Sequence, residues 1–201
     1  MADVRGVLSR PWVYEFFSRL VGGDQARRTL VREHVRPWDG ARVLDLGCGP
    51  GTLVTYLQDA RYVGIDVSER YIASARRTFG DRAEFRVGDA TQVDEDLRDF
   101  DLVLAFGILH HLSDEEAARL LLHARSALKG NGRLVTLDNT LLADERRRIA
   151  DRIVSWDRGE HVRSPSAYER LASLVFPTVK TTVHRNLLRI PYTHCVLECG
   201  K

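Results

Sequence analysis

Short apolar runs alternate with longer amphipathic segments through the middle of the chain, and this alternation constrains the fold most. The amphipathic segments have the spacing of helices, and Ser68 and Ser113 stand where two of them would be capped. Strands that alternate with helices pair in parallel, and nearly continuous apolar strands fit a sheet covered on both faces. The expected strands are ARVLDLG, RYVGID, AEFRVGD, DLVLAFG and GRLVTLD. The pattern predicts an α/β fold with a doubly wound, mostly parallel sheet.

Helices are expected before and between these strands. Residues 12–36 read as two helices broken at Gly22–Gly23, with Asp24 as the N-cap of the second. GTLVTYLQD follows the first strand, SERYIASARRTF the second, and SDEEAARLLLHARSALK the fourth. The last of these begins with acidic residues after Ser113 and ends at Lys129–Gly130, which is the charge pattern of a capped helix.

The chain of 201 residues has the length of a single domain, and four parts of it differ in pattern. Residues 1–38 form an N-terminal helical cap, 41–138 the alternating core, 143–163 a charged insert, and 164–201 a helix followed by two strand-like pieces. Joined near Pro191, these pieces predict an antiparallel hairpin that closes the far edge of the sheet. The insert is either a solvated surface helix or a lid over the carboxyl ends of the strands.

The charge balance argues against several classes of protein. The chain carries 30 Lys and Arg against 28 Asp and Glu, a formal net charge of +2, which is too balanced to suggest an electrostatic nucleic-acid binder. Its three Cys match no metal or disulfide framework. We find no signal-peptide pattern and no apolar run long enough to span a bilayer. We therefore expect a cytoplasmic protein with no membrane span.

The stretch VLDLGCGPG, residues 43–51, places three glycines directly after the first expected strand. A loop there must turn sharply and let a ligand touch its backbone, and glycine permits both. The spacing is G-x-G-x-G rather than the G-x-G-x-x-G of dinucleotide-binding folds. Pro50 removes a backbone N–H and Asp45 adds negative charge, so the turn suits a ligand with an ammonium group better than one with phosphates. The plain structural alternative is a tight connection with no ligand.

Two further strand ends carry acidic residues. The second strand ends in GID, which places Asp66 where a carboxylate can accept hydrogen bonds from a ribose diol. The third ends in GDA, which places Asp89 one strand further out, within reach of an adenine amino group. Three strand ends in a row therefore present polar groups that match parts of a nucleoside ligand.

In this order, VLDLGCGPG, GID, GDA and FDLVLAFGILHHL resemble the successive signatures of class I S-adenosylmethionine-dependent methyltransferases. The resemblance covers residues 42–138 strongly and the flanking parts in outline. It implies a Rossmann-like sheet of seven strands whose last strand runs antiparallel, with S-adenosyl-L-methionine as the cofactor and residues 41–138 as the cofactor-binding core. The set of motifs is specific to the superfamily and does not define a substrate.

The resemblance also implies a role for each strand end. The loop after the first strand would hold the methionine part of the cofactor, the end of the second strand its ribose, and the end of the third its adenine. The end of the fourth strand would lie near the reacting sulfur. The expected cofactor-binding residues of the first loop are Asp45, Gly47, Cys48, Gly49 and Gly51. At the end of the second strand they are Asp66 and Val67, and Val67 would pack on the adenine. Asp89 and Ala90 follow the third strand, and Phe106 and Gly107 end the fourth.

Candidate catalytic and substrate-binding residues follow from the chemistry of methyl transfer. The leaving group is a neutral thioether, so the protein must align the reactants and exclude water rather than supply an acid. A hydroxyl nucleophile gains from a general base, and His110 and His111 stand where the fourth strand meets its loop. His161, in the charged insert, is a further candidate. Tyr14 could favour a sulfonium with its aromatic face, with core packing as the alternative.

Asp138 and Asn139 end the fifth strand on the ligand side. They resemble the Asp-Asn pair of metal-dependent catechol-type O-methyltransferases. Those enzymes also carry an aspartate after the fourth strand, where this chain has Ala105–Phe106–Gly107. We therefore expect no metal, and expect the pair either to face the substrate or to form a strand-end turn.

Motifs that would define other acceptors do not occur. The (Asp/Asn)-Pro-Pro-(Tyr/Phe) motif of exocyclic-amine methyltransferases does not follow the fourth strand, and the Pro-Cys nucleophile of cytosine C5 enzymes is absent. A small organic molecule that accepts the methyl group on oxygen or nitrogen is the leading substrate class. The alternatives are an RNA or protein methyltransferase, a non-catalytic cofactor-binding scaffold, and a nicotinamide-dependent oxidoreductase. The oligomeric state is left open.

Overall fold

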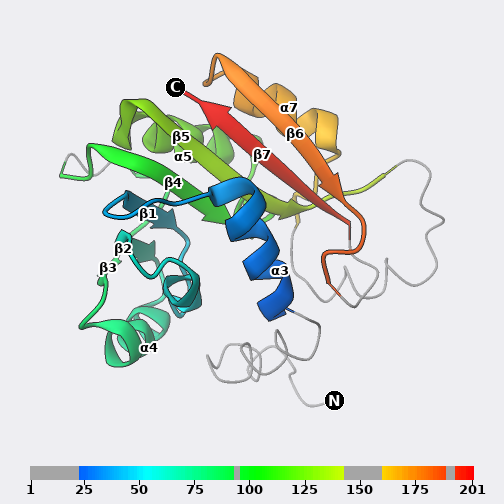
Figure 1. Cartoon of the computed structure of the whole chain (residues 1–201). Helices are drawn as coiled ribbons and strands as arrows, with labels where there is room; N and C mark the ends of the chain where they lie inside the picture. The colour runs from blue at the N-terminus through cyan, green and yellow to red at the C-terminus, as the bar shows by residue number, and fades with distance from the viewer. Residues whose placement is uncertain (1–22, 93–95, 143–159, 189–192) are drawn as a thin grey trace, which may run out of the picture.

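Seven strands form one central sheet in the parts of the chain that the computed structural model describes, residues 23–92, 96–142, 160–188 and 193–201 (Figure 1). The strand order is β3-β2-β1-β4-β5-β7-β6. The first five strands pair in parallel, whereas β7 runs antiparallel to both of its neighbours. The strands are β1 (Arg42–Leu46), β2 (Arg61–Asp66), β3 (Glu84–Val87), β4 (Phe100–Phe106), β5 (Leu128–Asn139), β6 (Thr178–His184) and β7 (His194–Gly200). The predicted doubly wound sheet with a C-terminal antiparallel hairpin is confirmed.

Helices cover both faces of this sheet (Figure 1). Strand β4 shows the reason, because Val103 and Ala105 pack into one apolar cluster while Leu102 and Leu104 pack into the other. The first cluster includes side chains of α5 (Asp114–Ala127) and α7 (Pro165–Ser173), and the second includes side chains of α3 (Gly23–Leu30), the following π-helical turn η1 (Val31–Val35) and α4 (Glu69–Phe79). A central strand that is buried on both faces needs the continuous apolar run seen in the sequence.

The hydroxyls predicted as N-caps make the expected hydrogen bonds. Ser68 Oγ accepts from the backbone N–H of Tyr71 at the start of α4. Ser113 and Glu116 form a complete capping box at the start of α5, with each side chain bonded to the other's backbone N–H. Both helices therefore begin where the local sequence alone predicts.

Four local predictions were wrong. Helix α5 ends at Ala127 and β5 begins at the next residue, so Lys129–Gly130 belong to the strand. Pairing of Phe100 with Leu128, followed by a register shift, extends β5 beyond the expected GRLVTLD. The segment GTLVTYLQD forms only a short 3-10 turn, η2 (Thr52–Tyr56). Asp24 lies inside the first turn of α3 rather than before it.

Some expectations fall on residues outside the described ranges. These are the first N-terminal helix with Tyr14, most of the charged insert, and the link near Pro191. Within the described ranges, no helix combines the length and the apolar character that crossing a membrane requires.

Replacing Ser113 with Ala should lower the free energy of unfolding by about 1 kcal/mol, because it removes the Oγ atom that accepts from Glu116 N and donates to Glu116 Oε2. Urea unfolding followed by circular dichroism measures the change. Ser173→Ala is the matched control, since Ser173 is an exposed serine at the last residue of α7. Equal effects of the two substitutions would contradict the role given to the capping box.

Candidate active site

The loops that follow β1, β2, β4 and β5 lie along one edge of the sheet, because these strands are parallel neighbours. The loop after β1 is anchored to β2, since Gly47 N and Cys48 N both donate to Ile65 O, at 2.8 and 2.9 Å. It also approaches the loop after β4, because a Cβ at Gly47 would lie 2.8 Å from Cδ1 of Ile108. The topology therefore assembles the candidate site from separate motifs of the sequence.

The three glycines of this loop all have positive φ, but they serve two purposes. A Cβ at Gly51 would lie 2.6 Å from the ring of Phe85, so this position is needed for packing. A Cβ at Gly49 would meet nothing within 4 Å, although its φ is +54°. The space beside Gly49 is therefore open, as a loop that admits a ligand against its backbone requires.

Asp66 ties the end of β2 to the glycine-rich loop. Its Oδ2 accepts from Gly49 N at 2.9 Å and its Oδ1 accepts from Ser68 N at 2.8 Å. Each oxygen keeps a lone pair for a further donor. The adjacent Val67 side chain is 69% exposed, so carboxylate and apolar surface stand side by side at this strand end. This combination fits a ribose with its attached base.

The two predicted residues after β3, Asp89 and Ala90, differ in their exposure. Asp89 is exposed, and its carboxylate accepts from the backbone and hydroxyl of Thr91 and from Gln92. The hydrogen bond from the Thr91 backbone is the largest cause that lowers the Asp89 pKa. Ala90 is buried, and its carbonyl accepts from His123 Nδ1. The side chain of Ala90 therefore packs in the core, and Asp89 is the exposed member of the pair.

Asp45 is a buried carboxylate beside the glycine-rich loop, with a relative exposure of 2%. The hydroxyl of Tyr62 donates to its Oδ2, while Oδ1 has no hydrogen-bond partner among the described residues. Burial raises the Asp45 pKa to about 7, the Tyr62 hydrogen bond opposes this shift, and the Asp66 charge adds to it. An unsatisfied carboxylate oxygen at this place fits a ligand that carries an ammonium group.

Cys48 has no features of a reactive thiol. It is buried, and burial is the largest cause that raises its pKa, followed by the charge of Asp45. A Cβ at Gly64 would lie 2.8 Å from its Sγ. The side chain of Cys48 therefore packs against β2, which leaves its backbone as the part that can serve a ligand.

His110 and Asp138 form a buried pair where β4 and β5 end. His110 Nδ1 lies 2.8 Å from Asp138 Oδ1, and the backbone N–H of His110 donates to the same oxygen. The two side chains are only 4% and 2% exposed. A carboxylate that accepts from Nδ1–H leaves Nε2 as the basic nitrogen of the ring. Burial raises the Asp138 pKa, and the His110 hydrogen bond opposes this shift.

The other predicted residues of this region lie around that pair. His111 is exposed, with its ring centroid 4.0 Å from that of His110. A Cβ at Gly107 would lie 3.8 Å from His110 Cε1. Phe106 is half-buried, and His161 is exposed with its backbone N–H bonded to His110 O at 3.0 Å. Asn139 is buried, and its carbonyl accepts from the hydroxyl of Tyr168.

Arg163 contacts the histidine turn, and the sequence analysis did not anticipate this. Its guanidinium donates to the carbonyls of Leu109 and Leu112, at 2.8 and 2.7 Å, and pairs with Asp114. These carbonyls flank the 3-10 turn η3 (Leu109–His111) that carries His110. Arg163 therefore positions the histidine turn from about 50 residues away, and only its membership of a charged insert marks it in the sequence.

The chain matches known methyltransferases. A family model described as a methyltransferase domain matches residues 43–132. An uncharacterized methyltransferase of Synechocystis is 33% identical over 141 residues, 64% of this chain and 63% of that protein. An O-methyltransferase of Pyrenophora dematioidea is 30% identical over 161 residues, 76% of this chain and 59% of that protein. The chain thus spans less than two thirds of the length of either relative.

A solved structure shows the same architecture. A protein from Pyrococcus horikoshii OT3 superposes with a TM-score of 0.68 at 23% identity, over 93% of this chain and 92% of that one. This likeness establishes the fold. The matching domain and the curated relatives show that residues 43–132 are similar to S-adenosylmethionine-dependent methyltransferases.

The raised pKa of Asp45 predicts how stability depends on pH. Between pH 3.8 and about 7 the folded state holds a proton that the unfolded state has lost, so stability falls as pH rises through this window. Asp45→Asn removes the ionisable group, so the stability of the variant should not fall in this way. The stability of the variant minus that of the wild type should therefore increase from pH 5 to pH 8. Urea unfolding of the ligand-free protein at both values measures it.

The control for this experiment is Asp81→Asn, which removes a carboxyl group from an exposed position. If the difference in stability between the wild type and Asp45→Asn is the same at pH 5 and pH 8, the raised pKa assigned to the buried Asp45 is contradicted.

Proposed function

We propose that this protein transfers a methyl group from S-adenosylmethionine to an oxygen or nitrogen atom of a small organic molecule. The observation that carries the proposal is the buried His110–Asp138 pair, which stands at the ends of β4 and β5 beside the glycine-rich loop. A hydroxyl acceptor needs a general base, and the hydrogen bond to Asp138 holds His110 in one tautomer. The pair therefore favours oxygen as the acceptor atom. The O-methyltransferase of Pyrenophora dematioidea supports the same acceptor atom.

The residues at the carboxyl edge fit the cofactor part by part. Asp45 offers an unsatisfied carboxylate oxygen for the ammonium group, and Gly49 offers open space along the backbone. Asp66 and Val67 offer a carboxylate and an exposed apolar surface for the ribose and the adenine. When bound, S-adenosylmethionine supplies a methyl group on a positively charged sulfur. The protein's part is to hold the acceptor in line with that methyl group and to keep water out.

In this proposal His110 takes the acceptor's proton. Asp138 accepts from Nδ1–H, so Nε2 is the nitrogen that receives a proton from a hydroxyl as the oxygen forms its new bond to carbon. The carboxylate then stabilises the imidazolium that forms. Arg163 holds the turn that carries the histidine, through the carbonyls on both sides of it. The base is thus oriented by groups from two other parts of the chain.

Calorimetric titration with S-adenosylmethionine, S-adenosylhomocysteine and NADH tests the cofactor. We expect the two sulfur compounds to bind and NADH not to bind. Asp66→Ala should weaken binding by roughly 1–3 kcal/mol, about 5- to 150-fold, because it removes acceptors for the ribose and support for Gly49. Asp81→Ala, at an exposed aspartate, is the matched control. Unchanged affinity in a folded Asp66→Ala protein, or binding of NADH alone, would overturn the assignment.

A panel of phenols, hydroxybenzoates and amines, with formation of S-adenosylhomocysteine as the readout, tests the acceptor. With a hydroxyl acceptor, His110→Gln should reduce kcat by roughly 10²- to 10⁴-fold at pH 7 and leave cofactor affinity unchanged. The loss should shrink at high pH, where the acceptor ionises without a base. Asp138→Asn should also reduce kcat, because the ring loses its fixed tautomer.

His111→Gln separates the two neighbouring histidines. A loss of kcat in this variant alone, with normal activity in His110→Gln, would move the base to His111 and overturn the role of the buried pair. Cofactor binding without turnover of any acceptor in the panel would favour a binding scaffold. Turnover of RNA or of a protein instead would overturn the small-molecule assignment.

A further inference from the structure

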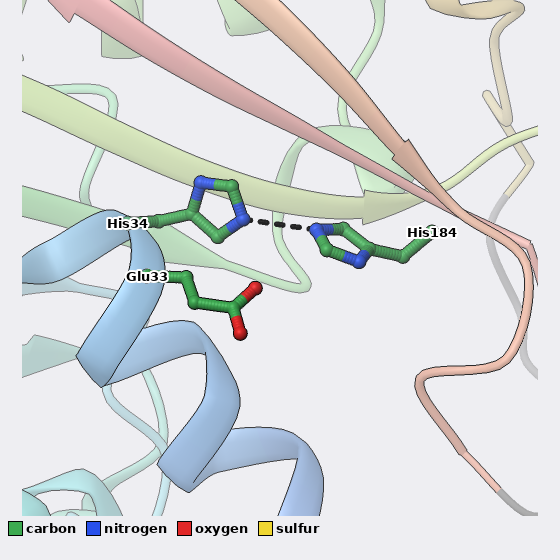
Figure 2. Close-up of side chains that lie close together, drawn as sticks. All are labelled: Glu33, His34 and His184. Atoms are coloured by element: carbon green, nitrogen blue, oxygen red, sulfur yellow. Dashed lines mark hydrogen bonds between the residues drawn. The ribbon is translucent and has the colours of Figure 1, made fainter.

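Three side chains that could bind a metal ion meet on the face of the sheet that α3 and η1 cover. Glu33 and His34 belong to η1, and His184 is the last residue of β6, 150 positions further along the chain (Figure 2). One ligand atom from each residue lies within 4.8 Å of the others. The Nε2 atoms of the two histidines face each other at 2.9 Å. None of these residues takes part in the site at the carboxyl edge described above.

This donor set matches the preferences of zinc-like ions. Two imidazole nitrogens and one carboxylate form a ligand set of three that leaves a fourth position open. Zinc–nitrogen bonds of about 2.0–2.1 Å in a tetrahedral site place neighbouring donor atoms about 3.3 Å apart. The two histidine nitrogens are already slightly closer than this, so a small opening of the pair makes room for the ion.

A fourth residue orients the buried histidine. His34 is only 5% exposed, and its Nδ1 lies 3.1 Å from Oε1 of Glu198 on β7. A carboxylate that accepts from Nδ1–H directs the lone pair of Nε2 toward His184, which is the usual arrangement behind a metal-binding histidine. Glu198 also pairs with Arg36, and Arg133 and Lys180 lie 3.9 and 3.8 Å from it. These cations therefore neutralise Glu198.

In the absence of a metal, the three residues make interactions that a bound ion can replace at little energetic cost. The two histidines share one hydrogen bond, so one Nε2 must carry a proton that an ion would displace. The carboxylate of Glu33 pairs with Arg32 at 2.7 Å, in an exposed ion pair of the kind that contributes little stability.

We propose that Glu33, His34 and His184 bind one divalent transition-metal ion of the zinc class. The ion ties η1, at the N-terminal side of the core, to the edge strand β6. Because the ligands come from the two ends of the described chain, the ion should bind the folded state and not the unfolded chain. Metal binding then raises the melting temperature in proportion to the logarithm of metal concentration once the site is filled.

The probes are Zn²⁺ alone and Co²⁺ alone, added to the full-length protein after treatment with a chelator. We expect one Zn²⁺ per chain by calorimetry and by elemental analysis after gel filtration. Co²⁺ should give visible d–d absorption with the intensity of a four-coordinate site. Zn²⁺ should also raise the melting temperature. A wild-type protein that retains no Zn²⁺ would overturn the proposal.

Variants separate this site from other histidines. His184→Gln and Glu33→Gln should each weaken Zn²⁺ binding at least tenfold and abolish the Co²⁺ absorption, and both remove half-exposed or exposed side chains that the core does not need for folding. Circular dichroism checks that each variant is folded. The controls are His161→Gln and Glu69→Gln, which change exposed residues away from the cluster. Zn²⁺ binding that is equal in the variants and the controls would place the ion elsewhere and overturn the assignment.

Discussion

The parallel pairing of β1 with β2 on one side and β4 on the other is the constraint on which the rest of the structure depends. It aligns Asp45 with Gly64 and Leu104 across three strands, so the loops that follow these strands leave the sheet at the same edge. Each loop alone is a short turn. Together with the loop after β5, they bring a carboxylate, an open glycine backbone and the His110–Asp138 pair to one edge of the sheet. This arrangement leaves polar groups buried at the ends of the strands, which is energetically unfavourable.

Two of these buried polar groups belong to the candidate active site. Asp45 and Asp138 are both nearly inaccessible, and each has one carboxylate oxygen without a hydrogen-bond partner among the described residues. Burial raises the pKa of both carboxyl groups, because it disfavours their charged form. Tyr62 and His110 each satisfy the other oxygen. A ligand that donates a hydrogen bond would satisfy the second oxygen of each carboxyl group. For this reason, these positions favour a binding site over a purely structural turn.

The strands β7 and β6 are held to the N-terminal elements by a second group of polar residues. Strand β6 is an edge strand, and the N-terminal elements α3 and η1 meet the sheet close to it (Figure 1). Glu198 on β7 draws together His34, Arg36, Arg133 and Lys180, so a single buried carboxylate connects η1 to the last three strands of the sheet. An ion held by Glu33, His34 and His184 would strengthen the same connection. The residues of this region are distinct from those of the methyltransferase motifs.

The sequence by itself determined the features that depend on neighbours along the chain. The alternation of apolar runs and helices gave the parallel sheet, the serine caps gave the starts of α4 and α5, and the glycine spacing indicated the loop beside Asp45. Tertiary structure alone decided which distant residues meet. The pairs His110–Asp138 and His34–His184 join positions 28 and 150 residues apart, and the length of β5 depends on the pairing of Leu128 with Phe100. The local sequence pattern does not indicate such pairings, because strand order and register bring these side chains together only when the chain folds.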